Sequence, residues 1–170
     1  QFRSNFRYFD VKNNVAGVRS EGLLPDFRTG MRSFNYVNSA AQNIALDNQL
    51  QADFATGPLV HKVLAGFDYQ RQDSTSNYKF AMIAPIDVFA PVYGAFIPPA
   101  STLAPFIDTQ TTTKQAGIYL QDQVKLDRWT LTLTGRQDWA QADTISKAIF
   151  PPAGTTLQND KASTGRVGLN

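Results

Sequence analysis

The feature that most constrains the fold is an alternation of apolar and polar residues that recurs in six runs along the chain. In the clearest run, near residues 129–147, Trp129, Leu131 and Leu133 alternate with threonines. Because successive side chains of a β-strand point to opposite faces of its sheet, this period predicts strands with one apolar face. The other runs lie near residues 1–13, 31–56, 61–80, 109–126 and 160–170. The sequence therefore predicts an all-β chain whose strands form an antiparallel sheet.

The use of acids and prolines supports this reading. Of the 14 acidic residues only Glu21 is a glutamate, while threonine and aromatic residues are plentiful. Glutamate favours helices, whereas threonine and aromatic residues favour strands. All nine prolines fall between the alternating runs, where a residue without an amide donor is tolerated in a sheet protein. Helix is therefore disfavoured over most of the chain.

The length of the runs and the spacing between them point beyond an ordinary sheet. Several runs alternate for roughly 15–20 residues, whereas strands of globular proteins usually have about 5–6. The connections alternate between long and short: a polar stretch up to Gly30, Gly57-Pro58, residues 81–108, Asp127-Arg128 and a Pro-Pro-Ala-Gly loop. Short turns at one end and longer loops at the other are typical of up-and-down transmembrane β-barrels of the outer membrane. The polar face, rich in Gln, Asn, Asp and Arg, suits a water-filled lumen.

Three aromatic residues have a predicted place in such a barrel. Trp129, Trp139 and Tyr69 lie on the apolar face of their runs. Outer-membrane barrels carry aromatic girdles where the apolar band meets the two membrane interfaces. We expect these three side chains to belong to the girdles, with ordinary packing within the sheet as the alternative.

Two other kinds of protein remain open on the alternation alone. A soluble, secreted β-sandwich that binds carbohydrate through exposed aromatic residues also has one solvated face per sheet. A passive porin-like barrel shares the alternation and the loop asymmetry with other outer-membrane barrels.

The composition excludes several kinds of chemistry. The chain has no cysteine and one histidine, His61, so we predict no metal site in it and no cofactor. A formal net charge of +2 gives no electrostatic case for nucleic acid. Asp122 and Asp138 form the one carboxylate pair on adjacent runs, and we expect them to be polar lumen or rim residues paired with Arg136 or Lys125. The sequence predicts no catalytic residues and no enzyme. It contains no apolar stretch long enough for a transmembrane helix, and no signal peptide is visible.

Three stretches together form a family pattern. Phe54-Ala-Thr-Gly57, followed by His61-Lys-Val-Leu-Ala-Gly-Phe-Asp-Tyr69, reads as strand, tight turn and strand. Gly117-Ile-Tyr-Leu-Gln-Asp-Gln123 and then Gly135-Arg-Gln-Asp138 with Trp139 follow in order. In these stretches the chain resembles the TonB-dependent siderophore receptors of bacterial outer membranes, close to the ferrichrome-type hydroxamate receptors. The resemblance covers essentially the whole chain and is clearest over residues 50–140.

The resemblance implies an outer-membrane receptor for ferric siderophores, in which a barrel of about 22 strands is filled by an N-terminal plug. At about 28 residues per strand such a barrel needs on the order of 600 residues, so we expect residues 1–170 to be a six-stranded part of the barrel domain. No plug pattern and no TonB box can be read in the sequence. The implied partners are a ferric siderophore of the hydroxamate class, the TonB system through the missing N-terminal part, and outer-membrane lipid. Iron enters only as the chelated ligand.

The long connection at residues 81–108 is the predicted ligand-binding segment. It carries five of the nine prolines and several aromatic residues, with only Asp87 charged before Asp108. An apolar loop on an outer rim is costly unless it packs on itself or meets a ligand. Family receptors bind siderophores with aromatic residues near the top of the barrel, which implies five siderophore-binding candidates: Tyr78, Phe80, Phe89, Tyr93 and Phe96. Packing of these residues against neighbouring loops is the alternative.

The first connection leaves the particular ligand open. It is mostly charged and small, with Arg19, Glu21, Asp26 and Arg28. The ferrichrome receptors carry a tyrosine pair in the corresponding loop, and this chain has no such pair there. The sequence therefore does not identify the siderophore.

Overall fold

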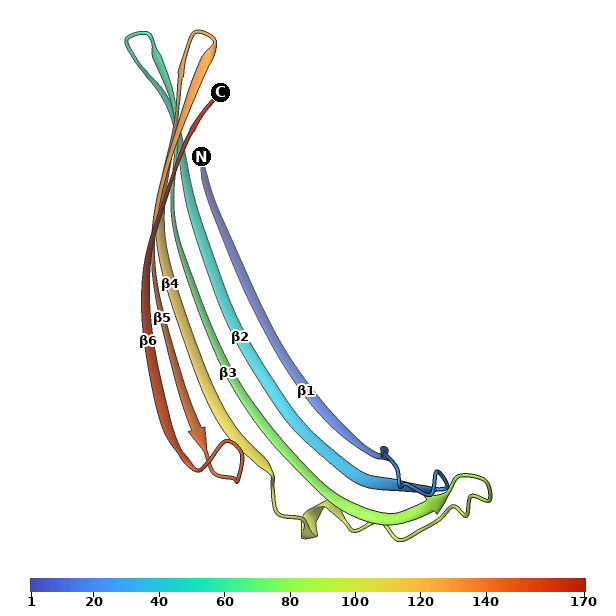
Figure 1. Ribbon diagram of the computed structural model, residues 1–170. Coiled ribbons are helices and arrows are strands. Elements are labelled where there is room, and N and C mark those ends of the chain that lie inside the picture. Colours follow the sequence, from blue (N-terminus) through green and yellow to red (C-terminus); the bar gives the residue numbers. More distant parts are fainter.

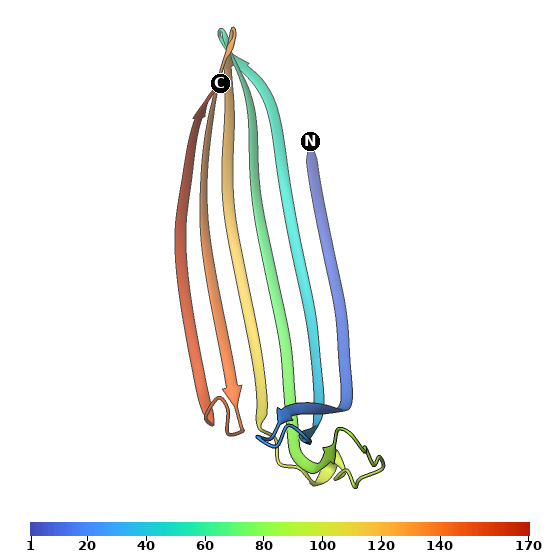
Figure 2. The ribbon, with the colours of Figure 1, turned by 45° about the vertical axis from the view of Figure 1, so that its right-hand side comes forward.

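The computed structural model describes all 170 residues and contains one antiparallel sheet of six strands. The strands are β1 (Phe2–Leu23), β2 (Thr29–Thr56), β3 (Leu59–Asp87), β4 (Ile107–Leu126), β5 (Trp129–Ser146) and β6 (Gly154–Leu169). Each strand pairs with the next one along the chain, as Figure 2 shows. The predicted all-β, up-and-down order is therefore confirmed. A single 3₁₀ turn, η1 (Ala100–Thr102), lies between β3 and β4.

The sheet is a single layer without a packed core. Only 7 of the 170 residues are buried, and 101 of the 112 backbone hydrogen bonds lie within the strands. β1 and β6 are the two edges, so the sheet does not close on itself within these residues. A β-sandwich needs a second sheet packed on the first, whereas residues 1–170 form one sheet. No helix in the structure is both long enough and apolar enough to cross a membrane.

The connections fall into two classes at opposite ends of the sheet. Gly57-Pro58 and Asp127-Arg128 are two-residue turns, as predicted, with φ of +60° at Gly57 and +49° at Asp127. Both turns lie at the end where Figure 1 also shows the two termini. The connections at residues 24–28, 88–106 and 147–153 lie at the opposite end. We call these two ends the short-turn end and the long-connection end.

Several strands are longer than the sequence predicted. β1 continues to Leu23 instead of ending near residue 13, which leaves a first connection of only residues 24–28. β3 continues to Asp87 and β4 begins at Ile107, so the loop predicted at 81–108 spans residues 88–106. β6 begins at Gly154 instead of near residue 160. In these extensions the strict alternation of apolar and polar residues is lost: residues 14–23 are mostly small or polar, whereas residues 81–87 carry apolar side chains on both faces, while the backbone ladder continues.

Pro85 corrects the prediction that every proline lies between strands. It falls inside β3, close to the point where the pairing with β2 shifts register between Gly30 and Arg32. The pairing of β3 with β4 has already ended at Tyr78 and Ile107. Proline is tolerated at a bulge or on an unpaired edge because no ladder hydrogen bond is lost there.

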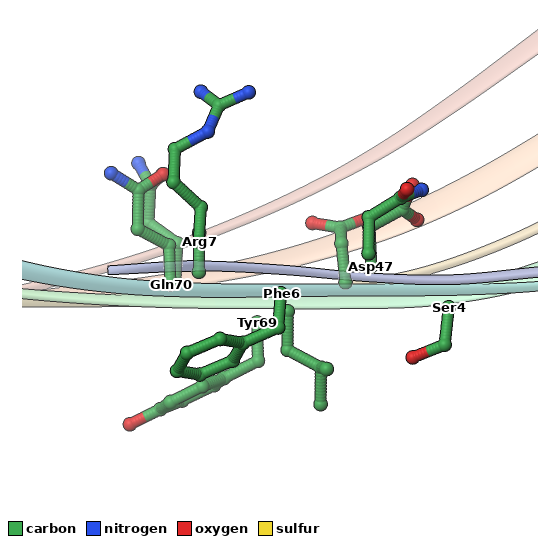
Figure 3. A pocket seen from close by; sticks show the side chains of 11 residues that line it. Ser4, Phe6, Arg7, Asp47, Tyr69 and Gln70 are labelled. Atoms are coloured by element: carbon green, nitrogen blue, oxygen red, sulfur yellow. The ribbon is translucent and has the colours of Figure 1, made fainter. Parts of the chain in front are cut away.

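The register assigns every strand residue to one of two faces. Phe6, Leu46, Tyr69, Ala116 and Trp139 form one row across five strands. Figure 3 shows Phe6 and Tyr69 on one side of the sheet, and Arg7, Gln70 and Asp47 on the other. We call the first the apolar face and the second the polar face. The alternation predicted for all six runs is confirmed.

Aromatic residues bound the apolar face at both ends. Trp129 lies in the row nearest the short-turn end, where it pairs with Leu126. Trp139, on the same face of β5, shares its row with Tyr69. Ten residues of a strand span about 33 Å, which at a tilt near 40° gives an apolar band of about 25 Å. That is the height that an outer-membrane barrel presents to lipid, and the three aromatic residues lie where girdles would be.

Candidate functional site

Four aromatic residues come together on the polar face at the long-connection end. Tyr78 and Phe80 extend from β3, Phe106 precedes β4, and Phe150 lies in the connection between β5 and β6. The ring centroids of Tyr78 and Phe80 are 6.0 Å apart, and Phe106 meets both rings edge-on at 6.2 and 5.5 Å. Phe150 stacks on Phe106 at 5.9 Å. We call these four residues the aromatic cluster.

Backbone hydrogen bonds hold the aromatic cluster in place. The Phe106 amide donates to the Tyr78 carbonyl at 2.8 Å, and the Phe150 amide donates to the Phe106 carbonyl at 3.0 Å. The Tyr78 hydroxyl donates to Asn35 Oδ1 on β2 at 2.5 Å. Phe80 remains 40% exposed and Phe150 59% exposed, so the cluster leaves apolar ring surface uncovered at this end of the sheet. Such a preformed aromatic surface binds bulky ligands with little loss of side-chain entropy.

The other three predicted residues do not join this cluster. Phe89, Tyr93 and Phe96 are 77–78% exposed in the 88–106 loop and make no ring contact. Tyr93 lines a cavity of about 480 Å³, together with Val18 and Ile83. Both of those residues lie on the apolar face by their register, so this part of the loop covers the opposite side of the sheet from Tyr78 and Phe80. The structure therefore divides the five candidates into two separate groups.

Sequence reasoning missed Phe106 and Phe150. Each lies in a connection, directly beside a proline: Phe106 follows Pro105 and Phe150 precedes Pro151. The signal that could have found them is topological, because the connections after β3 and after β5 emerge at the same end of an antiparallel meander. Aromatic residues in both were therefore candidates for contact.

A charged network on the polar face joins several residues of the three sequence stretches that carry the family resemblance. Arg136 Nη1 contacts Asp68 at 2.8 Å, its Nε donates to Asp138 at 2.9 Å, and its guanidinium lies 5.5 Å from the centre of the Tyr119 ring. The Tyr119 hydroxyl donates to Asp47 Oδ1 at 3.1 Å. These five residues, the Arg136 network, link β2, β3, β4 and β5 across the wall.

Two glycines make room for this network. A Cβ on Gly66 would lie 2.1 Å from the Tyr119 ring, and a Cβ on Gly117 would lie 2.3 Å from Arg136 Nη2. Both side chains therefore lie flat across the sheet only because those positions carry no side chain. Six positions of the motifs are thus parts of one structural unit: Gly66, Asp68, Gly117, Tyr119, Arg136 and Asp138.

The predicted pairing of Asp122 and Asp138 is half wrong. Asp138 pairs with Arg136 on the polar face, as expected. Asp122 lies on the apolar face, where its Oδ2 is 2.8 Å from His61 Nδ1. His61 also stacks on Phe54 at 5.0 Å, so its ring has an aromatic neighbour as well as a hydrogen-bond partner. The two carboxylates lie on opposite faces and cannot act on one substrate, and no group of three metal-ligating side chains occurs.

Hydrogen bonds and an ion pair to two aspartates stabilise the connections at the long-connection end. Asp26 accepts hydrogen bonds from the Thr29 hydroxyl at 2.6 Å and from two backbone amides, which lowers its pKa from 3.8 to about 2. The Arg28 guanidinium contacts Asp87 at 2.6 Å and lowers the pKa of that carboxyl. The Asp87 carboxylate also accepts hydrogen bonds from the Phe89 and Ala90 amides, so the start of the 88–106 loop is fixed to the first connection.

Comparison with known proteins shows that this six-stranded sheet is similar to one part of larger proteins. All of residues 1–170 match the family model described as TonB dependent receptor-like, beta-barrel. The chain is 38% identical over 146 residues to the ferrioxamine B receptor of Salmonella typhimurium strain SL1344, which covers 85% of this chain and 20% of the relative. It is 30% identical over 173 residues to the ferrioxamine receptor of Yersinia enterocolitica, covering 99% of this chain and 24% of the relative.

A solved structure agrees on the fold. The siderophore receptor PiuA of Acinetobacter baumannii superposes with a TM-score of 0.76 at 17% identity, over 99% of this chain and 27% of that one. The chain therefore spans about a fifth to a quarter of the length of the proteins it matches. The relatives are named as receptors, and none of these names describes an enzyme.

Proposed function

Because the chain belongs to the TonB-dependent receptor β-barrel family, we propose that the whole protein takes up ferric siderophores through the outer membrane. Members of this family are outer-membrane proteins of Gram-negative bacteria, and that is where the chain resides. The observation that carries the proposal is the 38% identity with a ferrioxamine B receptor over 85% of the chain. In this role the chain supplies barrel wall and three outer connections.

The ligand class proposed is a ferric hydroxamate. The relatives that match most of the chain are named for ferrioxamine, a siderophore of that class. In such a complex the chelator masks the charge of the iron and presents apolar methylene surface outward. The aromatic cluster offers matching apolar surface, and each Å² removed from water on both sides contributes about 25 cal/mol. Iron is the cargo here and needs no resident cofactor.

The orientation follows from the two classes of connection. Outer-membrane barrels have short periplasmic turns and longer extracellular loops. The long-connection end, with the aromatic cluster and the 88–106 loop, is then the cell-surface end. The polar face lines the lumen, because the apolar face must meet lipid. The aromatic cluster thus lies at the mouth of the lumen, where an incoming ligand first meets the wall.

The transport step needs parts outside this chain. We propose that energy reaches the bound ligand through the TonB system and a plug domain, which the family resemblance implies. The contribution of this chain is to remain rigid. The Arg136 network bridges four strands on the lumen side, so the wall behind the ligand keeps its shape while other parts move.

The five original candidates keep a role in the proposal as two groups. Tyr78 and Phe80 contact the ligand from the aromatic cluster, together with Phe106 and Phe150. Phe89, Tyr93 and Phe96 form a second set of contacts when the 88–106 loop moves from the apolar side of the sheet onto the ligand, since 77–78% of their surface is free to be buried. Prolines in that loop limit the entropy lost on closure.

The experiment is a ligand-binding measurement on the full-length receptor. Phe80→Ala with Phe150→Ala should weaken ferrioxamine B affinity about tenfold or more, since each ring loses about 1.5 kcal/mol of burial. Phe89→Ala, Tyr93→Ala and Phe96→Ala together test the loop group separately. The control is Phe67→Ala, which removes from the apolar face a phenylalanine that is as exposed as Phe80. Unchanged affinity in both groups, with the barrel folded, would place the site elsewhere.

A further inference from the structure

A continuous row of side-chain hydrogen bonds on the polar face leads from the aromatic cluster to the far end of β1. The Tyr78 hydroxyl lies 2.5 Å from Asn35 Oδ1, and Asn35 Nδ2 lies 2.7 Å from Ser33 Oγ. Ser33 Oγ in turn lies 2.5 Å from Glu21 Oε1, close to where the pairing of β1 with β2 shifts register. Ser33 is only 1% exposed, so bulk water does not compete for its hydroxyl. We call these four residues the hydrogen-bond chain.

The carboxylate at the end of the hydrogen-bond chain fixes the direction of every bond in it. Hydrogen bonds from Ser33 and Arg19 lower the pKa of Glu21, so this side chain is ionised at neutral pH and can only accept. Ser33 must therefore donate its one hydroxyl proton to Glu21, and it accepts from Asn35. Asn35 then turns its nitrogen to Ser33 and its oxygen to Tyr78. Because Tyr78 uses its only proton on Asn35, its oxygen presents an acceptor and no donor to a ligand.

The surroundings make the Tyr78 oxygen a favourable partner for a positive charge. Hydrogen bonds in a row polarise one another, so a row that ends on a carboxylate makes the last oxygen more negative. The two basic residues next to the hydrogen-bond chain are both already paired. Arg19 Nη2 lies 2.9 Å from Glu21, and Lys79 Nζ donates to the backbone carbonyl of Ala100 at 3.0 Å. Neither of these two cations is therefore free to occupy the place beside Tyr78.

We propose that Tyr78 and Phe80 bind a protonated amine of the ligand, so that the receptor prefers ferric hydroxamates that carry a free ammonium group. This inference rests on the proposed uptake of ferric hydroxamates and names the subclass. An ammonium group has three donors and no acceptor, which matches an oxygen that can only accept. The Tyr78 and Phe80 rings are stacked with centroids 6.0 Å apart, and Phe80 is 40% exposed, so a cation also meets aromatic ring surface. An anionic ligand group finds no donor at this place.

The first part of the test compares three ligands on the full-length receptor in detergent, by calorimetric titration. Ferrioxamine B ends in a primary amine that is protonated at neutral pH, and its N-acetyl derivative has the same iron centre without that charge. The unaltered receptor should bind ferrioxamine B about tenfold or more tightly than the N-acetyl derivative, since a hydrogen bond to a charged group and a cation–π contact are lost together. The N,N-dimethyl derivative keeps the charge and one N–H donor while adding comparable bulk. It should bind within about threefold of ferrioxamine B.

The second part changes the receptor. Tyr78→Phe keeps the ring and removes the oxygen, so the preference for ferrioxamine B over the N-acetyl derivative should fall to about threefold or less. The matched control is Tyr36→Phe, which removes a hydroxyl from the apolar face of β2 and should keep the full preference. Arg19→Gln with Glu21→Gln removes the carboxylate that directs the hydrogen-bond chain without changing the net charge. This double variant should reduce the preference about threefold, because the Tyr78 proton is then free to turn towards the ligand.

The outcomes separate this inference from the proposed transport function. Equal affinity of the unaltered receptor for ferrioxamine B and its N-acetyl derivative would overturn the inference, and so would a preference that survives Tyr78→Phe intact. In both cases ferrioxamine B still binds, so the transport function stands. A full preference in the Arg19→Gln, Glu21→Gln variant would show that the hydrogen-bond chain does not direct Tyr78. If none of the three ligands binds, the transport function fails and this inference falls with it.

Discussion

At the scale of single residues, two glycines determine how the long side chains pack on the polar face of the sheet. Gly66 and Gly117 each leave a notch into which a long side chain of a neighbouring strand folds. Without the notches, Tyr119 could not lie flat enough to reach Asp47, and Arg136 could not hold Asp68 and Asp138 together. These glycines are therefore needed for a close approach and not for an unusual backbone angle.

This leads to a prediction for Gly66→Ala. The new Cβ would lie 2.1 Å from the Tyr119 ring, so the ring must move and its hydrogen bond to Asp47 is strained or lost. We expect Gly66→Ala to lower the free energy of unfolding of the full-length barrel by about 1–3 kcal/mol, as overpacking generally does. The measurement is the midpoint of denaturant unfolding.

A matched substitution isolates the steric cause. Gly135 lies in β5, and a Cβ there would meet nothing within 4 Å. Gly135→Ala should therefore change the free energy of unfolding by less than about 0.5 kcal/mol. Equal destabilisation by both substitutions would contradict the account of the notch.

At the scale of elements, β5 provides the sharpest test of the two faces. Leu133 is 42% exposed on the apolar face near the middle of the band, and Thr132 is its neighbour on the polar face. Leu133→Arg should destabilise the full-length protein in a bilayer by about 2–4 kcal/mol, and Thr132→Arg by less than about 1 kcal/mol. Unfolding in lipid vesicles measures both. Equal costs would mean that the apolar face of β5 does not meet lipid.

The first connection should respond to acid. The pKa of Asp26 is lowered from 3.8 to about 2, so its hydrogen bonds to Thr29 and Arg28 stabilise the fold fully above pH 3.8. That contribution is lost as the pH falls through about 2, when the carboxyl is protonated in the folded state as well. Amide hydrogen exchange at Arg28 and Thr29 should therefore accelerate over this window.

A substitution checks the assignment. In Asp26→Asn the amides of Arg28 and Thr29 should exchange faster at neutral pH, and exchange corrected for its intrinsic pH dependence should no longer change between pH 4 and pH 2. If the unaltered protein shows no such change either, Asp26 does not hold the turn.

The elements also show how far sequence could predict the structure. The apolar period placed Trp129, Leu131 and Leu133 on one face because lipid requires it, and the structure agrees. The apolar–polar alternation is lost in strand segments that extend beyond the lipid-facing band. For this reason the second half of β1 and the end of β3 were predicted as connections. Backbone pairing nevertheless continues there, because the partner strand β2 supplies hydrogen bonds that the local sequence does not reveal.

Side-chain partners were harder to predict than faces. Asp122 breaks the apolar period of β4, and only the register reveals that His61 lies beside it on the same face. The aromatic cluster joins residues from β3 and from two separate connections, so its membership depends on where two loops fold. Tyr78 and Phe80 were predicted because they adjoin the aromatic loop, whereas Phe106 and Phe150 required the three-dimensional arrangement.

At the scale of the whole molecule, the chain is a wall without a core. With 7 of 170 residues buried, its stability comes from the backbone ladder and from what covers its two faces. The exposed edges of β1 and β6 carry unpaired backbone groups, which in water invite aggregation. In a complete barrel, lipid would cover the apolar face and neighbouring strands would pair with the edges of β1 and β6. An occupied lumen would cover the polar face. The function proposed here is therefore a property of the complete barrel, to which this wall contributes the aromatic cluster and the 88–106 loop.

The central claim is that this wall belongs to a receptor that imports ferric hydroxamates. The most direct measurement is uptake of ⁵⁵Fe-labelled ferrioxamine B by iron-starved cells that lack the full-length gene and are complemented with it. The account predicts energy-dependent uptake that is lost in the deletion strain, restored by the unaltered gene, and reduced about tenfold or more at subsaturating ligand by Phe80→Ala with Phe150→Ala. Uptake that is the same in the deletion and complemented strains, across ferrioxamine B and other ferric hydroxamates, would contradict it.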